Sequence, residues 1–402
     1  MTERDDVVVV GGGIVGLATA WTVAQQRSEA RVTVLEKEAA VGAHQTGHNS
    51  GVIHSGAYYR PGSVKARTCR RGRELLLKFL AERRLPYRIV GKLIVAAAPA
   101  ELPALEQIRR RAEKNGVAGV RLVTADELRT LEPEVAGVAA LEVPTAGITD
   151  YAEVARALAR DLSTRGHLVR VGAEVTGVTA DRDGVTVRLA DGGTVRARYL
   201  INCAGLDSDR VARCSGLDPP VRIVPFRGEY YWVRAARRLG LTRLIYPVPD
   251  PGLPFLGVHL TLTITGRIEA GPNAVLALAR EGYRRGTISL RDLWETASWP
   301  GSVRLARRLF GTGSYEFLRS RSRGWFARDL ARLVPSLTAD DLEPGGAGVR
   351  AQAVDRRGAL VDDFVIVNGP RMTHVLNAPS PAATSSFGLA EEIVRGLPAE
   401  PA

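Results

Sequence analysis

Cysteine is scarce in this sequence of 402 residues. Only Cys69, Cys203 and Cys214 are present, at irregular spacing. Three such residues cannot build a disulfide framework, and their spacing does not match a zinc site. We therefore expect free thiols, no bound metal and a cytoplasmic location.

Long apolar runs are also missing. No stretch approaches the ~20 apolar residues that a membrane-spanning helix needs. The run from Val7 to Ala20 has the length of a signal-peptide core, but acidic residues precede it and glycines interrupt it. The sequence thus predicts neither a membrane span nor a signal segment.

Aromatic residues make up only 6% of the chain, although its formal net charge is +12. The basic residues are nearly all Arg, are scattered along the sequence and do not form a nucleic-acid module. We interpret the Arg excess as a solvated surface and expect no nucleic-acid partner. Such a surface would still attract acidic ligands.

What the chain does contain is the alternation of strands and helices of an α/β fold. Val7 to Val10 and Val32 to Leu35 read as buried strands on either side of a helix from Ile14 to Gln25, which is a βαβ unit with parallel strands. Shorter strand-like runs between Pro220 and Gly271 indicate a separate antiparallel sheet.

A glycine-rich turn joins the first strand to the first helix. Gly11, Gly13 and Gly16 match G-x-G-x-x-G, whose glycines allow a tight turn, a close approach to a pyrophosphate and close helix packing. The helix N-terminus adds unpaired N–H groups and a partial positive charge. Glu36 ends the second strand, where a carboxylate can bind ribose hydroxyls. This segment predicts a dinucleotide site and does not separate NAD from FAD.

These features indicate two intertwined domains. We predict a Rossmann-like nucleotide-binding domain made of three segments, 1–85, 147–218 and 340–402. An α+β substrate domain with an antiparallel sheet, formed by 86–146 and 219–339, would be inserted into it. A chain of this length can enclose both a cofactor and a small substrate.

The loop from His44 to Gly56 carries the strongest functional signal. It holds three of the six histidines of the chain, together with three glycines, Asn49 and Ser50. A loop so polar and so rich in glycine suits close wrapping around a cofactor and its reactive ring. An ordinary exposed loop is the alternative interpretation.

Together with further blocks, this loop resembles the L-2-hydroxyglutarate oxidase or dehydrogenase family. That family lies within the wider group of FAD oxidoreductases that act on D-amino acids and glycerol 3-phosphate. The other blocks that carry the resemblance are Tyr58 to Ala66, Gly91 to Val95, Cys203 to Leu206, Ile223 to Tyr230, Ile245 to Asp250, Pro254 to His259, Gly271 to Val275, Ala347 to Asp355 and Asn377 to Ser385.

The resemblance implies FAD-dependent oxidation of L-2-hydroxyglutarate to 2-oxoglutarate by hydride transfer to the flavin. Another 2-hydroxy acid, or an amine or amino acid of a specialised pathway, stays open as the substrate. Oxygen and a quinone stay open as the electron acceptor. An NAD-dependent dehydrogenase would leave the histidine-rich loop unexplained, and a flavin-binding protein without turnover is a further alternative.

Oxidation of a hydroxy acid needs a base for the hydroxyl proton, which suits histidine with its pKa of about 6.5. The resemblance points to His54 as this base. His259, on an expected strand of the inserted domain, is a second catalytic candidate or a core histidine. Arg350 is expected to clamp a substrate carboxylate. Further candidates for contact with the substrate are Tyr246, Asn377 and Ser380, and more weakly Lys65 and Arg227.

The expected cofactor site extends beyond the glycine turn. Val175 would contact the adenine through its backbone, and Pro381 and Ala382 precede a helix whose N-terminus could stabilise negative charge on a reduced flavin. The full set of expected cofactor-binding residues is Gly11, Gly13, Gly16, Glu36, Thr46, His48, Asn49, Ser50, Val175, Gly205, Pro381 and Ala382.

Two segments depart from the family pattern. Ala146 stands where a hydroxyl-bearing side chain is expected, and Arg284 to Leu337 contain few recognisable blocks. The second segment mixes basic and apolar residues, which fits a peripheral membrane surface or, alternatively, a solvated helix that covers the substrate domain. The residues concerned are Arg304, Arg307, Arg308, Trp325, Phe326 and Arg328.

Overall fold

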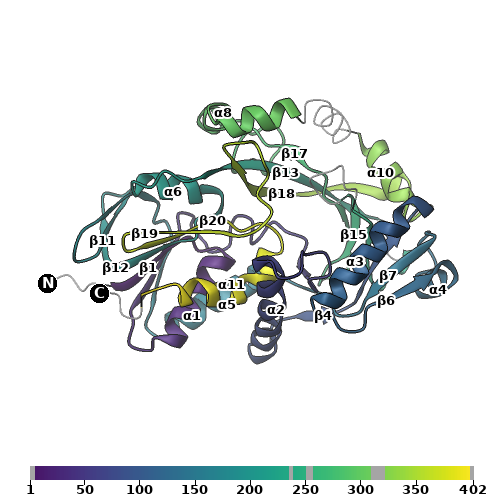
Figure 1. The fold of residues 1–402 in the computed structure, drawn as a ribbon, viewed down its shortest axis with the longest axis horizontal. Helices are drawn as coiled ribbons and strands as arrows, with labels where there is room; N and C mark the ends of the chain where they lie inside the picture. Colours follow the sequence, from purple (N-terminus) through teal and green to yellow (C-terminus); the bar gives the residue numbers. More distant parts are fainter. Residues whose placement is uncertain (1–4, 235–238, 250–256, 309–321, 399–402) are drawn as a thin grey trace.

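The computed structural model describes residues 5–234, 239–249, 257–308 and 322–398. Two large sheets form the two halves of the molecule, and helices pack against both (Figure 1). The mixed α/β class predicted from the sequence is confirmed.

The first sheet contains the opening βαβ unit. Its strands run in the order β10 (Val175–Ala180), β11 (Val185–Leu189), β12 (Thr194–Asn202), β1 (Asp5–Val10), β2 (Val32–Leu35) and β9 (Leu168–Arg170). From β12 to β9 the pairing is parallel. β20 (Met372–Asn377) also pairs in parallel with β12, and β19 (Val365–Gly369) pairs with β20. Residues far apart in the sequence thus build one sheet.

Four helices cover one face of this sheet: α1 (Ile14–Gln26), α2 (Val64–Glu82), α5 (Tyr151–Thr164) and α11 (Ala382–Arg395). α6 (Ser208–Cys214) lies against the other face (Figure 1). Because both faces are covered, Val7 to Val9 are fully buried, which explains their uninterrupted apolar run. The side chain of Asp150 caps α5 by accepting from the backbone N–H of Ala152.

Helices α2 and α11 cross at two glycines. A Cβ on Gly72 would lie 2.6 Å from the carbonyl oxygen of Thr384, and a Cβ on Gly388 would lie 2.6 Å from that of Thr68. Only glycine allows the two backbones to come so close. The crossing holds the first turn of α11 beside the segment that follows β3 (Val52–Ile53).

The second sheet is largely antiparallel. Its order is β17 (Val275–Leu276), β13 (Val221–Val233), β16 (Ile268–Gly271), β15 (His259–Leu262), β14 (Leu244–Pro247), β5 (Lys92–Ala96), β7 (Ala139–Val143) and β6 (Arg121–Thr124). β18 (Leu342–Asp355) pairs with β13 along almost its whole length. Residues 340–402 therefore contribute strands to both sheets, and the domain boundaries stay a prediction.

A small third sheet links the two halves, in the order β3, β8 (Gly147–Thr149) and β4 (Tyr87–Ile89). The remaining helices within the described ranges are α3 (Leu102–Lys114), α4 (Ala125–Leu131), α8 (Leu290–Ala297) and α10 (Arg323–Ala331), with short 3-10 turns at Pro99–Glu101, Gly205–Asp207 and Ala339–Asp341. Among the described residues, no helix is long and apolar enough to cross a membrane.

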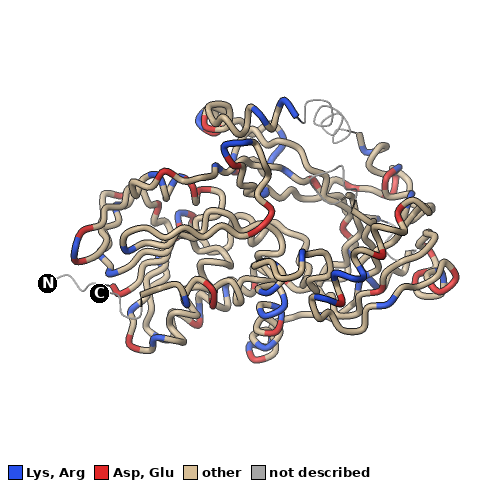
Figure 2. The backbone as a smooth tube through the Cα atoms, in the orientation of Figure 1, with Lys and Arg blue, Asp and Glu red and all other residues tan. Residues whose placement is uncertain are grey.

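Acidic and basic residues are distributed along the backbone of both halves of the molecule (Figure 2). This agrees with the scattered Arg residues of the sequence. In α10, Phe326 is buried against the ring of Tyr231, with ring centroids 4.6 Å apart. The apolar residues of α10 thus serve in part to cover the second sheet.

Candidate active site

A cavity of about 1040 Å³ is lined by residues of both large sheets. This volume lies at the upper end of the ~300–1,000 Å³ range of small-molecule sites. The lining begins at the β1–α1 turn, follows the loop after β2 and reaches β14, β15 and β18 of the second sheet. It includes every predicted catalytic residue: His54, His259 and Arg350.

The glycine turn forms one wall of this cavity. Gly11 has a φ of +108°, and a Cβ there would lie 2.5 Å from the carbonyl oxygen of Cys203. Gly13 is the N-cap of α1 and has no side chain with which to cap this helix. Gly16 does not line the cavity; a Cβ there would lie 2.0 Å from the carbonyl oxygen of Gly11. Its role is therefore close packing of the turn.

Glu36 and Thr46 hold the turn in place. Oε2 of Glu36 accepts from the backbone N–H of Gly12 at 2.7 Å, and Oγ1 of Thr46 accepts from that of Ile14 at 2.9 Å. Among the described residues, each Glu36 oxygen accepts one hydrogen bond, and that of Oε1 comes from the N–H of Glu38. The carboxylate keeps lone pairs for hydroxyl donors.

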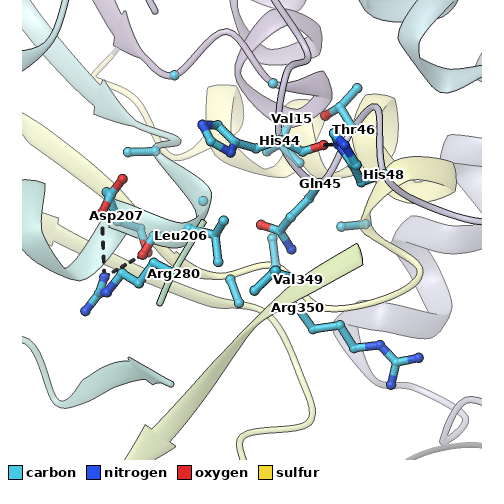
Figure 3. Close-up of a pocket in the computed structure, with 18 of the residues that line it drawn as sticks. Val15, His44, Gln45, Thr46, His48, Leu206, Asp207, Arg280, Val349 and Arg350 are labelled. Atoms are coloured by element: carbon cyan, nitrogen blue, oxygen red, sulfur yellow. Dashed lines mark hydrogen bonds and ion pairs between the residues drawn. The ribbon is translucent and has the colours of Figure 1, made fainter. Parts of the chain in front are cut away.

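The loop after β2 lines one side of the cavity. Figure 3 shows His44, Gln45 and His48 on this loop, opposite Val349 and Arg350 of β18, with Gln45 pointing between the two. Asn49 shapes the loop, because its Nδ2 donates to the carbonyl of Thr46 and its Oδ1 accepts from Gly51. Further predicted cofactor residues also line the cavity: His48, Ser50, Val175, Gly205, Pro381 and Ala382.

At another end of the cavity, charged residues connect the two halves of the molecule. Arg280 bonds the carbonyl of Leu206 and the carboxylate of Asp209, and Figure 3 shows it beside Asp207. Lys37 bonds Asp207 at 3.0 Å and also Glu281. Ligand atoms of Glu38, His44 and Glu281 lie within 4.8 Å of one another, but the ammonium of Lys37 already supplies the positive charge there.

His54 lies where the β3 segment meets α11. Its backbone N–H donates to Oγ1 of Thr384 at 3.0 Å, and that hydroxyl also bonds the hydroxyl of Tyr151 at 2.8 Å. Burial, followed by the positive charge of Lys92, lowers the pKa of His54 well below its usual 6.5. The imidazole is therefore neutral at pH 7 and able to accept a proton.

His259 faces the same cavity from β15. Its ring stacks on Tyr246, with ring centroids 3.9 Å apart. Nδ1 lies 2.9 Å from the carbonyl oxygen of Gly257, which can only accept, so Nδ1 carries the proton. Burial lowers the pKa of His259 to about 3. Nε2 of the neutral ring is thus left as an acceptor.

The predicted cations differ in their partners. Arg350 lies on β18, and burial lowers its pKa from the usual 12.5 without removing its charge at pH 7. Lys65 lines the cavity and pairs with Asp362 at 2.8 Å. Arg227 pairs with Glu229 at 3.3 Å. The charge of Lys65 is therefore already balanced within the chain, whereas Arg227 shares its carboxylate with Arg285.

Tyr246 and Ser380 line the cavity as expected of substrate contacts, but Asn377 does not. The side-chain amide of Asn377 bonds backbone groups instead: it accepts from the N–H of Ala353 and donates to the carbonyls of Val361 and Asp363. Ala146 is fully buried in the core of the second sheet, away from the lining.

Sequence analysis missed several residues of this region. Gln45 belongs to the histidine-rich loop, but the sequence does not single it out as a site residue. Thr384 and Tyr151 act through backbone contacts that no local pattern reveals. Lys92 sits inside a buried strand, and this position was a usable signal, because a lysine in an apolar strand requires an explanation.

Comparison with protein families decides the assignment of the fold. The model of the family described as FAD dependent oxidoreductase matches residues 6–395. The chain belongs to this family. Among curated relatives, it is 47% identical to an L-2-hydroxyglutarate dehydrogenase of Indibacter alkaliphilus, covering 95% of this chain and 96% of the relative. An L-2-hydroxyglutarate dehydrogenase of Escherichia coli is 42% identical, with 97% and 92% covered.

Solved structures agree on the fold. L-alpha-glycerophosphate oxidase from Mycoplasma pneumoniae, with FAD bound, superposes with a TM-score of 0.80 at 24% identity, covering 98% of this chain and 94% of that one. Glycine oxidase from Geobacillus kaustophilus gives a TM-score of 0.73 at 20% identity, with 99% and 97% covered. The prediction of a Rossmann-like FAD-binding fold is thereby confirmed.

FAD fits the residues present. The glycine turn packs so closely on the Cys203 backbone that Gly11 admits no side chain, and it lines the cavity at the N-terminus of α1, where Gly13 offers no capping side chain and phosphates bind well. Glu36 offers its remaining lone pairs at the end of β2, as a ribose requires. These residues would hold the dinucleotide half of the FAD. The cofactor prediction is confirmed by the family match.

Proposed function

We propose that this chain oxidises L-2-hydroxyglutarate to 2-oxoglutarate. One observation carries the proposal: His54, His259 and Arg350 line the same cavity as the dinucleotide turn. The chain matches, over 95% of its length, a relative named L-2-hydroxyglutarate dehydrogenase. The oxidoreductases named among the solved structures are below 25% identity and support the fold alone.

The roles of the side chains follow from their chemistry. FAD, when bound, supplies the acceptor for the hydride that leaves C2 of the substrate. A neutral imidazole nitrogen of His54 takes the proton of the C2 hydroxyl, and the depressed pKa keeps it ready to do so at pH 7. Arg350 grips the carboxylate next to C2, and Nε2 of His259 accepts a hydrogen bond at the same end of the cavity.

The test is anaerobic mixing of the FAD-loaded protein with L-2-hydroxyglutarate, its D enantiomer and L-lactate. We expect rapid bleaching of the flavin absorbance with the L five-carbon acid alone. Bleaching by L-lactate or by an amine at equal speed would refute the proposed substrate. It would favour the alternative of another 2-hydroxy acid or an amino acid.

Oxygen and a quinone are the two candidate electron acceptors, and one surface favours the quinone. α8 exposes Leu290 (81%) and Trp294 (73%) beside the exposed cation Arg291. A helix with exposed apolar and basic residues suits peripheral contact with an anionic membrane. We expect Trp294→Ser to weaken sedimentation with anionic vesicles. Equal sedimentation of both proteins, with fast reoxidation by air, would favour oxygen and the cytoplasmic location expected from the sequence.

A further inference from the structure

Lys92 is a buried cation without a counter-ion. It opens β5 with 2% of its surface exposed. Within the described residues, its ammonium has no hydrogen-bond acceptor, and no carboxylate lies within 4.0 Å of it. A buried charge is stable only when it is paired or bonded. An anion from outside the chain would supply the missing partner.

Neighbouring cations show that the fold does provide partners elsewhere. Lys65 pairs with Asp362, and Lys37 pairs with Asp207. Only five of the 55 basic residues are Lys, so Arg is the usual cation of this chain. Lysine differs from arginine in that its compact amine can lose its proton when buried. The amine at position 92 is thus unusual both in its residue type and in its lack of a partner.

Lys92 is surrounded by hydrogen-bond donors and aromatic rings. Its Nζ lies 3.9 Å from the ring centroid of Tyr246 and 5.4 Å from that of Tyr58. The aromatic faces stabilise the ammonium weakly. The hydroxyl of Tyr58 is buried and has no hydrogen-bond partner. An ammonium and an unused hydroxyl, both able to donate to a carboxylate, therefore belong to one aromatic cluster.

This cluster borders the cavity. Tyr246 lines the cavity, and so does His259, which stacks on it. Lys92 and Tyr58 are not themselves lining residues, but the Lys92 ammonium lies 3.9 Å from the ring centroid of the lining residue Tyr246, and its four-carbon stem is flexible. Its charge also acts on the imidazoles of His54 and His259, which both line the cavity. Rotation of this stem would bring the ammonium to a carboxylate at that end of the cavity.

We infer that Lys92 and the Tyr58 hydroxyl form the subsite for the second carboxylate of the substrate, the one that Arg350 does not bind. This inference rests on the proposed function and deepens it. Lys92 would be the residue that selects dicarboxylic over monocarboxylic 2-hydroxy acids. Truncating one partner of a buried charge pair lowers affinity strongly, because the other charge is left unpaired.

Titration supports the same assignment. Burial lowers the pKa of Lys92 to about 7. The groups around it hold one charge state from pH 6 to 9: burial raises the pKa of the Cys69 thiol to about 12, raises those of Tyr58 and Tyr246, and lowers those of His54 and His259. Within this cluster Lys92 is thus the group that changes charge over that range. Glu269, whose charge acts on Tyr246, titrates beside the cluster, because burial raises its pKa to about 7.

The experiment compares two substrates in the FAD-loaded protein: L-2-hydroxyglutarate and L-2-hydroxypentanoate, which lacks the second carboxylate. Dissociation constants come from the dependence of anaerobic flavin reduction on substrate concentration. We expect Lys92→Met to weaken the dianion by about 30-fold or more and to leave the monoanion unchanged. Lys78→Met, an exposed lysine on α2, is the matched control and should change neither constant.

The pH profile provides a second test, in which Lys92→Met separates the titration of Lys92 from that of Glu269. The preference in kcat/KM for the dianion should be constant below pH 6 and fall above pH 7, by about 100-fold at pH 9, as the ammonium is lost. A preference that survives in Lys92→Met, or that does not vary with pH, overturns the inference. Failure of the wild type to be reduced by L-2-hydroxyglutarate overturns the proposed function instead, so the two failures are distinct.

Discussion

Removal of the Thr384 hydroxyl should lower both the stability of the protein and its rate of catalysis. It is fully buried, and its Oγ1 accepts from the His54 backbone N–H at 3.0 Å, bonds the Tyr151 hydroxyl at 2.8 Å and donates to the Val52 carbonyl at 3.2 Å. Thr384→Val keeps nearly the same shape, so it removes the hydroxyl and little else.

The loss of stability in Thr384→Val depends on which hydrogen-bond partners of Thr384 keep another bond. The hydroxyl of Tyr151 also donates to Val52 at 3.1 Å, so those two groups keep a bond in the variant. The His54 N–H loses its acceptor. An unsatisfied buried donor costs ~1–3 kcal/mol, so we expect the free energy of unfolding to fall by about 2 kcal/mol. Tyr151→Phe should cost about 1 kcal/mol, because Thr384 still bonds His54 and Val52.

Catalysis should suffer as well, since the same bond fixes the segment that carries the His54 imidazole. A displacement of a reacting group by about 1 Å can reduce the rate ~100-fold. We therefore expect slower flavin reduction at saturating L-2-hydroxyglutarate in Thr384→Val, with the flavin spectrum unchanged. Urea unfolding of the FAD-loaded protein and anaerobic stopped-flow absorbance measure the two effects.

Two results would refute this reasoning. One is a Thr384→Val protein that matches the wild type in both unfolding free energy and reduction rate. The other is a greater loss in Tyr151→Phe than in Thr384→Val. The double variant adds a check, because residues that share a hydrogen-bond network should give non-additive losses.

Three further predictions follow. His54→Gln should slow flavin reduction by ~10²–10⁴ without loss of FAD, and an unchanged rate would exclude His54 as the base. Gly72→Ala should destabilise the protein by ~1–3 kcal/mol in thermal unfolding, because its methyl group would meet the α11 backbone, whereas Gly346→Ala, in open space, should not. His259 has a folded pKa of about 3, below the unfolded value of about 6.5, so the unfolded chain protonates first. Stability should fall as the pH drops from 6.5 towards 3, and a His259→Gln variant with the same slope would contradict this.

Local patterns predicted the nucleotide half of the fold well. The helix expected from Ile14 to Gln25 spans Ile14–Gln26 in the structure, because apolar spacing acts within a few residues. The buried run of Val7 to Val10 is a central parallel strand for the same kind of reason. The histidine-rich loop was singled out by composition and does line the cavity.

Partners distant in the sequence could not be predicted in this way. Asn377 belongs to a family block, yet its amide is consumed by the backbone at 353, 361 and 363, which only the fold brings together. Phe326 reads as part of a basic, apolar surface, but it packs on Tyr231. Lys92 looks like one residue of a buried strand until the neighbouring strand supplies Tyr246. Long-range pairing decides all three.

The net charge of the chain and the charge of its cavity have different consequences. The excess of +12 is spread over both halves of the molecule, where salt screens it within ~10 Å at 0.1 M. Such charge speeds the arrival of any acidic ligand without distinguishing one from another. Discrimination needs cations inside the low-dielectric site, where a missing carboxylate leaves a charge unpaired. Arg350 keeps its charge from pH 6 to 9, whereas Lys92, with a pKa of about 7, is about half protonated at pH 7. A second substrate carboxylate would therefore both bind Lys92 and favour its protonated form.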